Sequence, residues 1–396
     1  MELKFPTGFQ AAGLHSGIKP DAALDLALIY SQFPCSAVGI FTTNQVQAAP
    51  VIYDREILAR SADVQAVVIN SGNANACTGK AGLDNTRQMA VQAAEACRLP
   101  PDSALVLSTG VIGVPLLMDK LLPGIRAAAR ALSPQGWTAA AQAIMTTDTR
   151  PKMAARTARA GYTIAGIAKG SGMIAPNMAT MLAVIATDAV VPAAHLQDLL
   201  HSAARLSFNR IVVDGDMSTN DTVLLLANGA ARIQIGDEQR DEFETLLQEV
   251  CTELAQAIVR DGEGATKFVQ LRVTGAVDPV SAAQVGRAIA TSPLCKTAFY
   301  GADPNWGRIL CAAGYAGVPL DAGQISLWIE KLDGSPAIQL VAQGEPVPFD
   351  EQQAAALMQL PEWQVRLDLG SGAHEAVLWT CDLSEAYIHI NGHYRT

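Results

Sequence analysis

Apolar side chains recur at three- and four-residue intervals between residues 237 and 259, which is the clearest periodic segment of the chain. The apolar positions are Phe243, Leu246, Leu247, Val250, Leu254 and Ile258. This spacing places them on one face of a helix, so the segment predicts a long amphipathic helix that packs on a core. The glycine-rich sequence Asp-Gly-Glu-Gly at 261–264 predicts the end of that helix.

Short β-branched or alternating runs predict strands elsewhere, and an Ala-, Met- and Gln-rich segment predicts a further helix. The strand runs are residues 64–70, 104–107, 268–273 and 365–369, and the helical segment is 80–99. Strands and helices interleave without a regular βαβ repeat. The sequence therefore predicts an α/β protein in which helices cover sheets, rather than a doubly wound parallel sheet.

The run at 365–369 has the strictest alternation. Val365, Leu367 and Leu369 alternate with charged residues, which predicts one buried and one exposed face. The sequence Gly-Ser-Gly at 370–372 follows directly and is typical of a hairpin turn.

Composition excludes several classes of protein. The chain has 396 residues, of which 49% are hydrophobic and 17% charged, so it is not disordered. Its length predicts one large or two medium-sized domains. A net charge of −10 without Lys/Arg runs argues against nucleic acid or an anionic membrane as the main partner.

Cysteine usage and the absence of a targeting signal predict a cytoplasmic protein. The seven cysteines are never spaced as Cys-x-x-Cys, and we expect them to be buried free thiols in a reducing compartment. The first ten residues contain no apolar stretch of signal-peptide length. Residues 170–187 are uncharged, but Pro176, Asn177 and several glycines and hydroxyls make them a poor membrane helix.

Two interpretations compete for residues 162–191. Gly170-x-Gly172-x-x-Ala175, with Asp188 further on, matches the dinucleotide-binding fingerprint. That fingerprint must open a helix, however, and Pro176 falls inside the helix it would need, at a cost of about 3 kcal/mol. We therefore disfavour a nicotinamide cofactor.

The second interpretation is a self-cleaving chain whose new N-terminal residue is Thr180. A threonine hydroxyl needs an adjacent base, and cutting the chain before it supplies its own α-amine. The small Ala179 after a Gly/Pro corner would let the hydroxyl reach the preceding carbonyl. From spacing alone, a buried threonine at the start of a strand is the stronger interpretation.

Two patterns resemble metal sites but lack essential features. The sequence beginning at Asp214 has Thr219 and Leu225 where a calcium-binding loop requires Gly and Glu. His389 and His393 have helical metal spacing, but residues 387–391 alternate like a strand. We predict no metal.

Six further motifs carry a resemblance to a known family. They are NSGNANACTG at 70–79, STGVIG at 108–113, IMTTDTRPK at 144–152, GDMSTNDT at 215–222, DGEGATK at 261–267 and GADPNWGRI at 301–309. With KGSGMIAPNMATMLAVIATDA at 169–189, they resemble the ornithine acetyltransferase (glutamate N-acetyltransferase) family over essentially the whole chain.

The resemblance implies a fold, a cleavage site and a set of site residues. The fold is an α/β, self-processing, layered α-β-β-α sandwich. Cleavage between Ala179 and Thr180 gives an α chain of residues 1–179 and a β chain of residues 180–396, which assemble as an α2β2 heterotetramer. Thr180 is the nucleophile, and Thr109 and Gly110 form the oxyanion hole. The substrate-binding residues are Thr146 or Thr147, Lys169, Thr180, Glu263, Asn391 and Thr396.

The implied activity is that of an acyltransferase of arginine biosynthesis with no bound cofactor. It transfers the acetyl group of N2-acetyl-L-ornithine to L-glutamate, and acetyl-CoA is a possible second donor. Lys169 suits an α-carboxylate and Glu263 a cationic side chain. The alternative is a self-cleaving aminopeptidase or amidohydrolase, in which water takes the second step.

Overall fold

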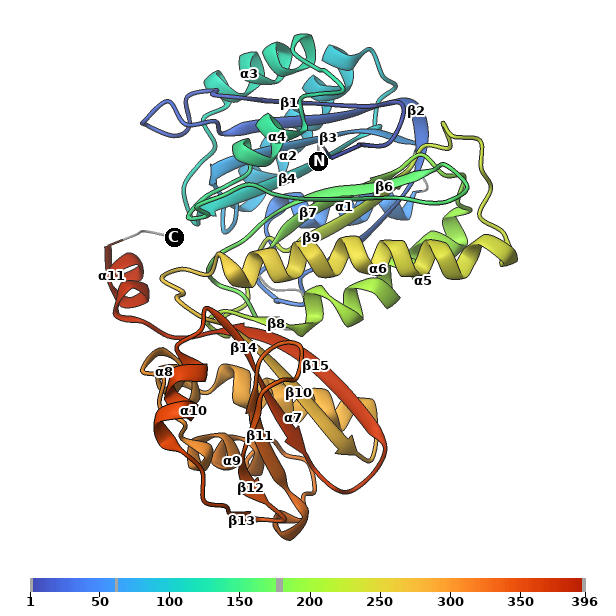
Figure 1. Cartoon of the computed structure of the whole chain (residues 1–396). Helices are drawn as coiled ribbons and strands as arrows, with labels where there is room; N and C mark the ends of the chain where they lie inside the picture. The colour runs from blue at the N-terminus through green and yellow to red at the C-terminus, as the bar shows by residue number, and fades with distance from the viewer. Residues whose placement is uncertain (1–2, 61–62, 176–180, 394–396) are drawn as a thin grey trace. The chain divides into compact units, whose positions relative to one another are not determined.

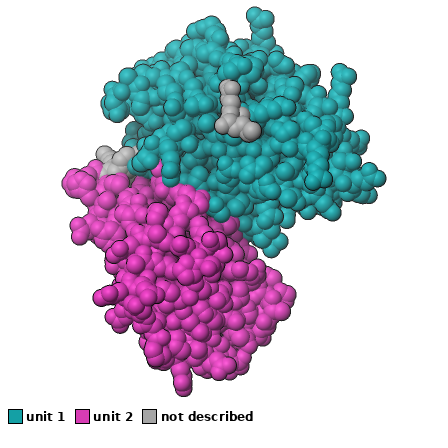
Figure 2. All heavy atoms as spheres, in the orientation of Figure 1, with its two compact units in different colours: residues 1–209, 216–258, 395–396 teal, residues 210–215, 259–394 magenta. Residues whose placement is uncertain are grey.

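The computed structural model describes residues 3–60, 63–175 and 181–393 (Figure 1). The chain divides into two compact units, coloured separately in Figure 2. Unit 1 comprises Met1–Asn209, Asp216–Ile258 and Arg395–Thr396, and unit 2 comprises Arg210–Gly215 and Val259–Tyr394. This agrees with the two medium-sized domains that the chain length allows.

Unit 1 contains an eight-stranded sheet with the order β4-β3-β2-β9-β7-β6-β5, and β1 pairs with β2. The strands are β1 (Phe9–Leu14), β2 (Leu26–Phe41), β3 (Val64–Asn73), β4 (Ala104–Val111), β5 (Lys152–Thr157), β6 (Thr163–Lys169), β7 (Leu182–Thr187) and β9 (Thr222–Ala227). The first part of the long strand β2 pairs with β3 and its last part pairs with β9. Strand β2 therefore joins two parts of the sheet.

These two parts form adjacent layers between helices. Figure 1 shows β1–β4 in one layer and β6, β7 and β9 in the next, with α3 outside the first and α5 and α6 outside the second. One buried apolar cluster includes Val67 and Leu105 from the first layer and Ile167 and Val184 from the second. The predicted α-β-β-α sandwich is confirmed.

The helices of unit 1 are α1 (Ala49–Ala59), α2 (Gly79–Cys97), α3 (Met118–Arg130), α4 (Trp137–Ala143), α5 (Ala193–Leu206) and α6 (Asp237–Arg260). The last two residues of α6 belong to unit 2. A 3-10 turn at Phe208–Arg210 follows α5. Helix α6 confirms the amphipathic helix predicted from its apolar stripe. Its Phe243 ring lies 5.8 Å from the Tyr162 ring, and its Leu254 side chain faces Gly166 of β6. The stripe thus covers the second sheet layer.

Unit 2 contains a seven-stranded sheet with the order β13-β12-β11-β14-β10-β15-β8. Its strands are β8 (Ile211–Val212), β10 (Phe268–Ala276), β11 (Ser326–Glu330), β12 (Ala337–Ala342), β13 (Glu345–Pro346), β14 (Glu362–Asp368) and β15 (His374–Cys381). Its other helices are α7 (Pro279–Thr291), α8 (Pro293–Tyr300), α9 (Trp306–Gly314), α10 (Glu351–Met358) and α11 (Glu385–His393), with a 3-10 turn at Ala322–Gln324. All four predicted strands and the helix at 80–99 are present, as β3, β4, β10, β14 and α2.

The hairpin predicted at 370–372 is wrong. Strand β10 lies between β14 and β15, pairing parallel with the first and antiparallel with the second. The turn therefore reverses the chain without pairing the strands on either side of it. The buried face predicted for β14 is confirmed, since Val365, Leu367 and Leu369 are at most 2% exposed.

The strand predicted at 387–391 is also wrong, because these residues belong to helix α11. None of the residues of α11 is buried, and the Ile388 side chain is 69% exposed. The alternation of apolar and polar residues therefore does not reflect a buried face.

The cysteines only partly follow the prediction. All seven are free, and Cys35, Cys251, Cys295 and Cys381 are buried. Cys77 and Cys311 are exposed, contrary to expectation. Among the described residues, no helix is long and apolar enough to cross a membrane.

Asp148 and Lys152 form a buried ion pair at the start of β5. The Lys152 Nζ lies 2.6 Å from Asp148 Oδ1, and the side chains are 1% and 0% exposed. The same carboxylate accepts the N–H groups of Thr146 at 3.0 Å and Gly170 at 2.7 Å. Burial by itself raises the pKa of Asp148, but the positive charges of Lys169 and Lys152 outweigh it and lower the pKa to about 2. The ionised carboxylate ties the segment before β5 to the end of β6.

Asp148→Asn should lower the free energy of unfolding by about 3–5 kcal/mol at pH 7, because a buried ammonium group loses its charged partner. The native pKa of Asp148 lies below its ordinary value of 3.8. Its stabilisation is therefore complete above roughly pH 4 and is lost as the pH falls towards about 2. Chemical denaturation at several pH values should show the difference between wild type and variant narrowing in that range.

Glu244→Gln is the matched control for this measurement. Its partner Arg240 lies 3.1 Å away in an exposed pair, so the change should cost less than about 1 kcal/mol. An Asp148→Asn effect no larger than this control would contradict the prediction.

Candidate active site

Three strand ends of unit 1 meet at one end of the second sheet layer. Lys169, at the end of β6, pairs with Leu182 of β7 in the antiparallel ladder. Leu182 also pairs with Thr222 of β9 in the parallel ladder. The end of β6 and the starts of β7 and β9 are therefore neighbours, and β7 begins just after the predicted cleavage site.

Thr109 and Gly110 lie near the end of β4, in the first sheet layer. Gly110 has φ +130° and pairs with Gly72 of β3, which has φ +95°. A Cβ on Gly110 would lie 2.3 Å from the carbonyl carbon of Gly72. Only glycine permits this backbone crossing, and a backbone without side chains lets N–H groups approach a ligand closely. That geometry suits a predicted oxyanion hole.

Lys169 and Thr109 are brought together from the two sheet layers. The Lys169 Nζ donates to Thr109 Oγ1 at 3.3 Å, and the residues are 3% and 5% exposed. Two of the residues predicted from the family motifs are therefore direct neighbours, although 60 positions separate them in the chain. Gly110 follows Thr109 directly.

Asn220 makes a second link between the layers, and sequence analysis did not identify it. Its Nδ2 donates to the backbone carbonyl oxygens of Ala74 at 2.6 Å and Ser108 at 2.8 Å. The Ser108 hydroxyl in turn donates to Asn70 Oδ1 at 2.6 Å. Asn220 thus fixes the peptide immediately before Thr109.

Lys19 is a second, half-buried cation at this end of unit 1, also missed by sequence analysis. Its Nζ donates to the carbonyl oxygens of Met145 at 2.7 Å and Leu24 at 2.8 Å, and its side chain lies beside Gly72. Burial lowers the pKa of Lys19. The negative charges of Asp25 and Asp148 oppose this shift, and the positive charge of Lys169 adds to it. The two lysines give the site a positive potential that suits a carboxylate.

The carboxylate of Asp25 holds the segment that presents Lys19. It accepts the backbone N–H groups of Ser16, Gly17, Ile18 and Lys19 at 2.6–3.1 Å. Burial raises the pKa of Asp25, but these hydrogen bonds outweigh it and lower the pKa overall. Asp25 is therefore an ionised structural anchor.

Thr146 and Thr147 are both half-buried but make different contacts. The backbone N–H of Thr146 donates to Asp148 Oδ2. The Thr147 Oγ1 lies 2.7 Å from the Ser171 hydroxyl, two residues after Lys169. The side chain of Thr147 therefore contacts the segment that follows β6, whereas Thr146 makes its contact with Asp148 through its backbone.

Glu263 and Asn391, predicted to bind substrate, lie together in unit 2. The Asn391 Nδ2 donates to Glu263 Oε2 at 2.7 Å and to the Tyr387 carbonyl at 3.1 Å. The Ser384 hydroxyl donates to the Gly264 carbonyl at 2.6 Å, which ties the 261–264 loop to the start of α11. Three predicted residues, Ala179, Thr180 and Thr396, lie outside the described residues.

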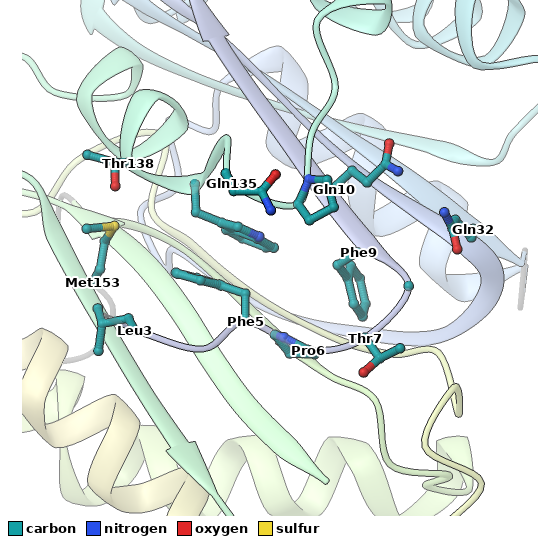
Figure 3. A pocket seen from close by; sticks show the side chains of 13 residues that line it. Leu3, Phe5, Pro6, Thr7, Phe9, Gln10, Gln32, Gln135, Thr138 and Met153 are labelled. Carbon is teal, nitrogen blue, oxygen red and sulfur yellow. The ribbon is translucent and has the colours of Figure 1, made fainter. Parts of the chain in front are cut away.

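A separate pocket of unit 1 does not contain the predicted residues. Figure 3 shows this cavity of about 720 Å³ along the N-terminal segment, where Phe5, Phe9, Gln10, Gln32 and Gln135 line it. No lining residue is charged. It therefore lacks the groups that a substrate with a carboxylate and an ammonium would need.

Comparison with known proteins agrees with the motifs. A family model described as the ArgJ family matches residues 10–396. An arginine biosynthesis bifunctional protein ArgJ of Symbiobacterium thermophilum is 50% identical over 99% of this chain and 98% of its own. A mitochondrial ArgJ of Chaetomium globosum is 47% identical over 99% of this chain and 88% of its own.

A solved structure is similar over part of the chain. The crystal structure of ArgJ from Bacillus halodurans is 39% identical with a TM-score of 0.50, and the match covers 53% of this chain and 98% of that one. Together with the sequence matches, it confirms the resemblance inferred from the motifs. The chain belongs to the ArgJ family.

Proposed function

We propose that the chain is an acyltransferase of arginine biosynthesis that moves the acetyl group of N2-acetyl-L-ornithine to L-glutamate. Membership of the ArgJ family supports this proposal. The observation that carries it is the meeting of Thr109, Gly110 and Lys169 at one end of unit 1, where β7 begins directly after the predicted nucleophile. This arrangement supplies hydrogen-bond donors and a positive charge at one place.

The reaction proceeds in two acyl-transfer steps. The Thr180 hydroxyl attacks the acetyl carbonyl, the C–N bond breaks, and ornithine leaves with a proton on its amine. The amine of glutamate then attacks the acetyl ester and releases Thr180. Donors beside Thr109 and Gly110 stabilise the oxyanion of each tetrahedral intermediate. The base is the α-amine of Thr180, a water or another side chain.

We assign the remaining residues by charge. Lys169 pairs with the α-carboxylate that N-acetylornithine, ornithine and glutamate carry, and Glu263 pairs with the cationic side chain of ornithine. Asn391 donates to Glu263 and orients it. Thr146 or Thr147, and Thr396, complete the substrate contacts.

Activity requires self-cleavage between Ala179 and Thr180, which leaves chains of residues 1–179 and 180–396. The solved Bacillus halodurans chain supports this, because about half of the present chain, 53%, accounts for 98% of it. We further propose that the two chains assemble as an α2β2 heterotetramer in the cytoplasm.

Acetyl-CoA is a second acetyl donor in this proposal. The relatives are named bifunctional, and both donors would form the same acetyl-Thr180 intermediate. No bound cofactor takes part.

The test of this function begins with the intact mass of the purified protein. We expect two chains, of 179 and 217 residues, with Thr180 at the N-terminus of the second. Thr180→Ala should remain one chain and be inactive, because it lacks the hydroxyl that both steps need. An uncut wild type with full activity would exclude the mechanism.

The same preparation then separates transfer from hydrolysis. With N-acetylornithine and glutamate, or acetyl-CoA and glutamate, the product should be N-acetylglutamate. Acetate released at the same rate without glutamate would instead indicate an amidohydrolase. The Thr180→Ala protein is the inactive control in the assays with both acetyl donors.

Gly110→Ala should lower kcat/KM by about hundredfold or more, the cost of losing an oxyanion donor. The added Cβ would collide with the backbone of Gly72 and displace the peptide. Gly113→Ala is the matched control, because Gly113 also has positive φ, +78°, but has open space around its Cβ position. Equal kinetic losses in the two variants would argue against an oxyanion role for Gly110.

Glu263→Gln should raise KM for N-acetylornithine about ten- to hundredfold, because a charged hydrogen bond of about 1.5–3 kcal/mol is lost. Self-cleavage should be unchanged. The control is Glu385→Gln, an exposed carboxylate at the start of α11. If both variants keep wild-type steady-state kinetics, Glu263 does not bind substrate.

A further inference from the structure

Asp221 holds the backbone of the residue that follows the predicted nucleophile. Its Oδ1 accepts the Met181 N–H at 3.0 Å, and the N–H of Thr222 donates to the Met181 carbonyl at 3.0 Å. The carbonyl of Asp221 accepts the Thr42 N–H at 2.8 Å, which ties it to the end of β2. Both polar backbone groups of Met181 are thus fixed by adjacent residues, Asp221 and Thr222.

The carboxyl of Asp221 has the surroundings of a neutral acid. Asp221 is 0% exposed, and among the residues that the structure describes none donates to its Oδ2. The ionised Asp148 is equally inaccessible but has Lys152 and two backbone N–H groups. Burial raises the pKa of Asp221 well above its ordinary value. The hydrogen bond from Met181, the charge of Lys169 and the polar groups of Thr42 and Ser218 only partly oppose this. A proton on Oδ2 makes this oxygen a hydrogen-bond donor.

Covalent geometry connects this acid to the predicted chemistry. The Met181 nitrogen that Asp221 holds is bonded to the carbonyl carbon of residue 180. Any displacement of Met181 is therefore transmitted to Thr180 through a planar, rigid peptide bond.

We propose that Asp221 is a positioning residue for Thr180 that acts through the Met181 amide in self-cleavage and in acetyl transfer. The inference rests on the proposed function, because it requires cleavage before Thr180. It assigns Asp221 no contact with the substrate. Its removal should therefore affect the rate of each step and leave substrate binding unchanged.

The test compares Asp221→Asn with Asp221→Ala. Asparagine keeps the carbonyl acceptor for Met181 and places an NH2 donor where the neutral acid has its hydroxyl, whereas alanine removes both. Each protein is made by cell-free synthesis, and the fraction cleaved is followed by gel and mass spectrometry. The Asp221→Asn protein should cleave at a rate within about threefold of the wild-type rate. The Asp221→Ala protein should cleave ten- to hundredfold more slowly than wild type.

Steady-state kinetics provide a readout that loss of structure alone would not give. Cleaved Asp221→Ala enzyme, quantified by the amount of free N-terminal Thr180, should show a lower kcat with an unchanged KM for N-acetylornithine. Thermal unfolding of each variant gives the folded fraction against which the rates are normalised. If Ala does not fold, Asp221→Val, which fills more of the site but cannot accept the Met181 N–H, takes its place.

Asp54 supplies a matched control. It is also 0% exposed, accepts one backbone N–H, that of Val106 at 2.9 Å, and has no described donor to its Oδ2. It lies on α1 and holds the middle of β4 instead of the start of β7. Asp54→Asn and Asp54→Ala should change stability without changing the cleavage rate of the folded protein.

The outcomes separate the inference from the function on which it rests. An uncleaved wild type would contradict the proposed function itself. A cleaving wild type with a folded Asp221→Ala variant of equal rate would overturn the positioning role. A folded Asp221→Asn variant that loses cleavage would also overturn it, since it would require an ionisable group at this position.

Discussion

The buried polar links between the two sheet layers of unit 1 are the constraint on which the candidate site depends. Apolar side chains can pack two layers together at several relative positions, but a buried amide or ammonium requires partners at defined distances. The Asn220 amide reaches two carbonyl oxygens of the opposite layer, and Lys169 reaches Thr109. Because both links lie next to the oxyanion candidates, they set the distance between β4 and the strands that carry the rest of the chemistry.

Four buried aspartates show how the same side chain is used in two ways. Asp25 and Asp148 are surrounded by N–H donors, and Asp148 also by lysines, so both are ionised and hold loops in place. Asp54 accepts the Val106 N–H and Asp221 the Met181 N–H, and burial raises the pKa of both carboxyls well above the ordinary value. Ionisation thus follows the number of donors, not the depth of burial. The first pair stabilises the fold through charge, and the second holds strand backbones without introducing a charge.

The spacing of apolar residues predicted those elements whose buried face is formed by residues close together in the sequence. Helix α6 and strand β14 follow directly from the spacing of their apolar residues. The pairing of β10 between β14 and β15 could not be predicted, since a turn sequence does not specify which strands pair. Helix α11 was missed because none of its alternating residues is buried. Lys19, Asn220 and Asp221 make their contacts with residues distant in sequence, so a local pattern does not reveal them. The sequence offers one local signal of a buried polar residue, a single charged residue beside an apolar run, which occurs at Asp25 and Asp221.

The two halves of the predicted chemistry come from different layers of unit 1. The candidate oxyanion donors belong to β4, where Gly110 crosses Gly72, and the predicted nucleophile, Thr180, precedes β7 in the sequence. Acyl transfer requires these groups to meet a carbonyl carbon and its oxygen simultaneously, within a fraction of an ångström. Residues that hold the two layers at a fixed distance, such as Asn220, therefore bear on the rate of the proposed reactions. The proposed self-cleavage would make the same demand on the chain's own carbonyl at residue 179, so one rigid frame can serve both proposed reactions.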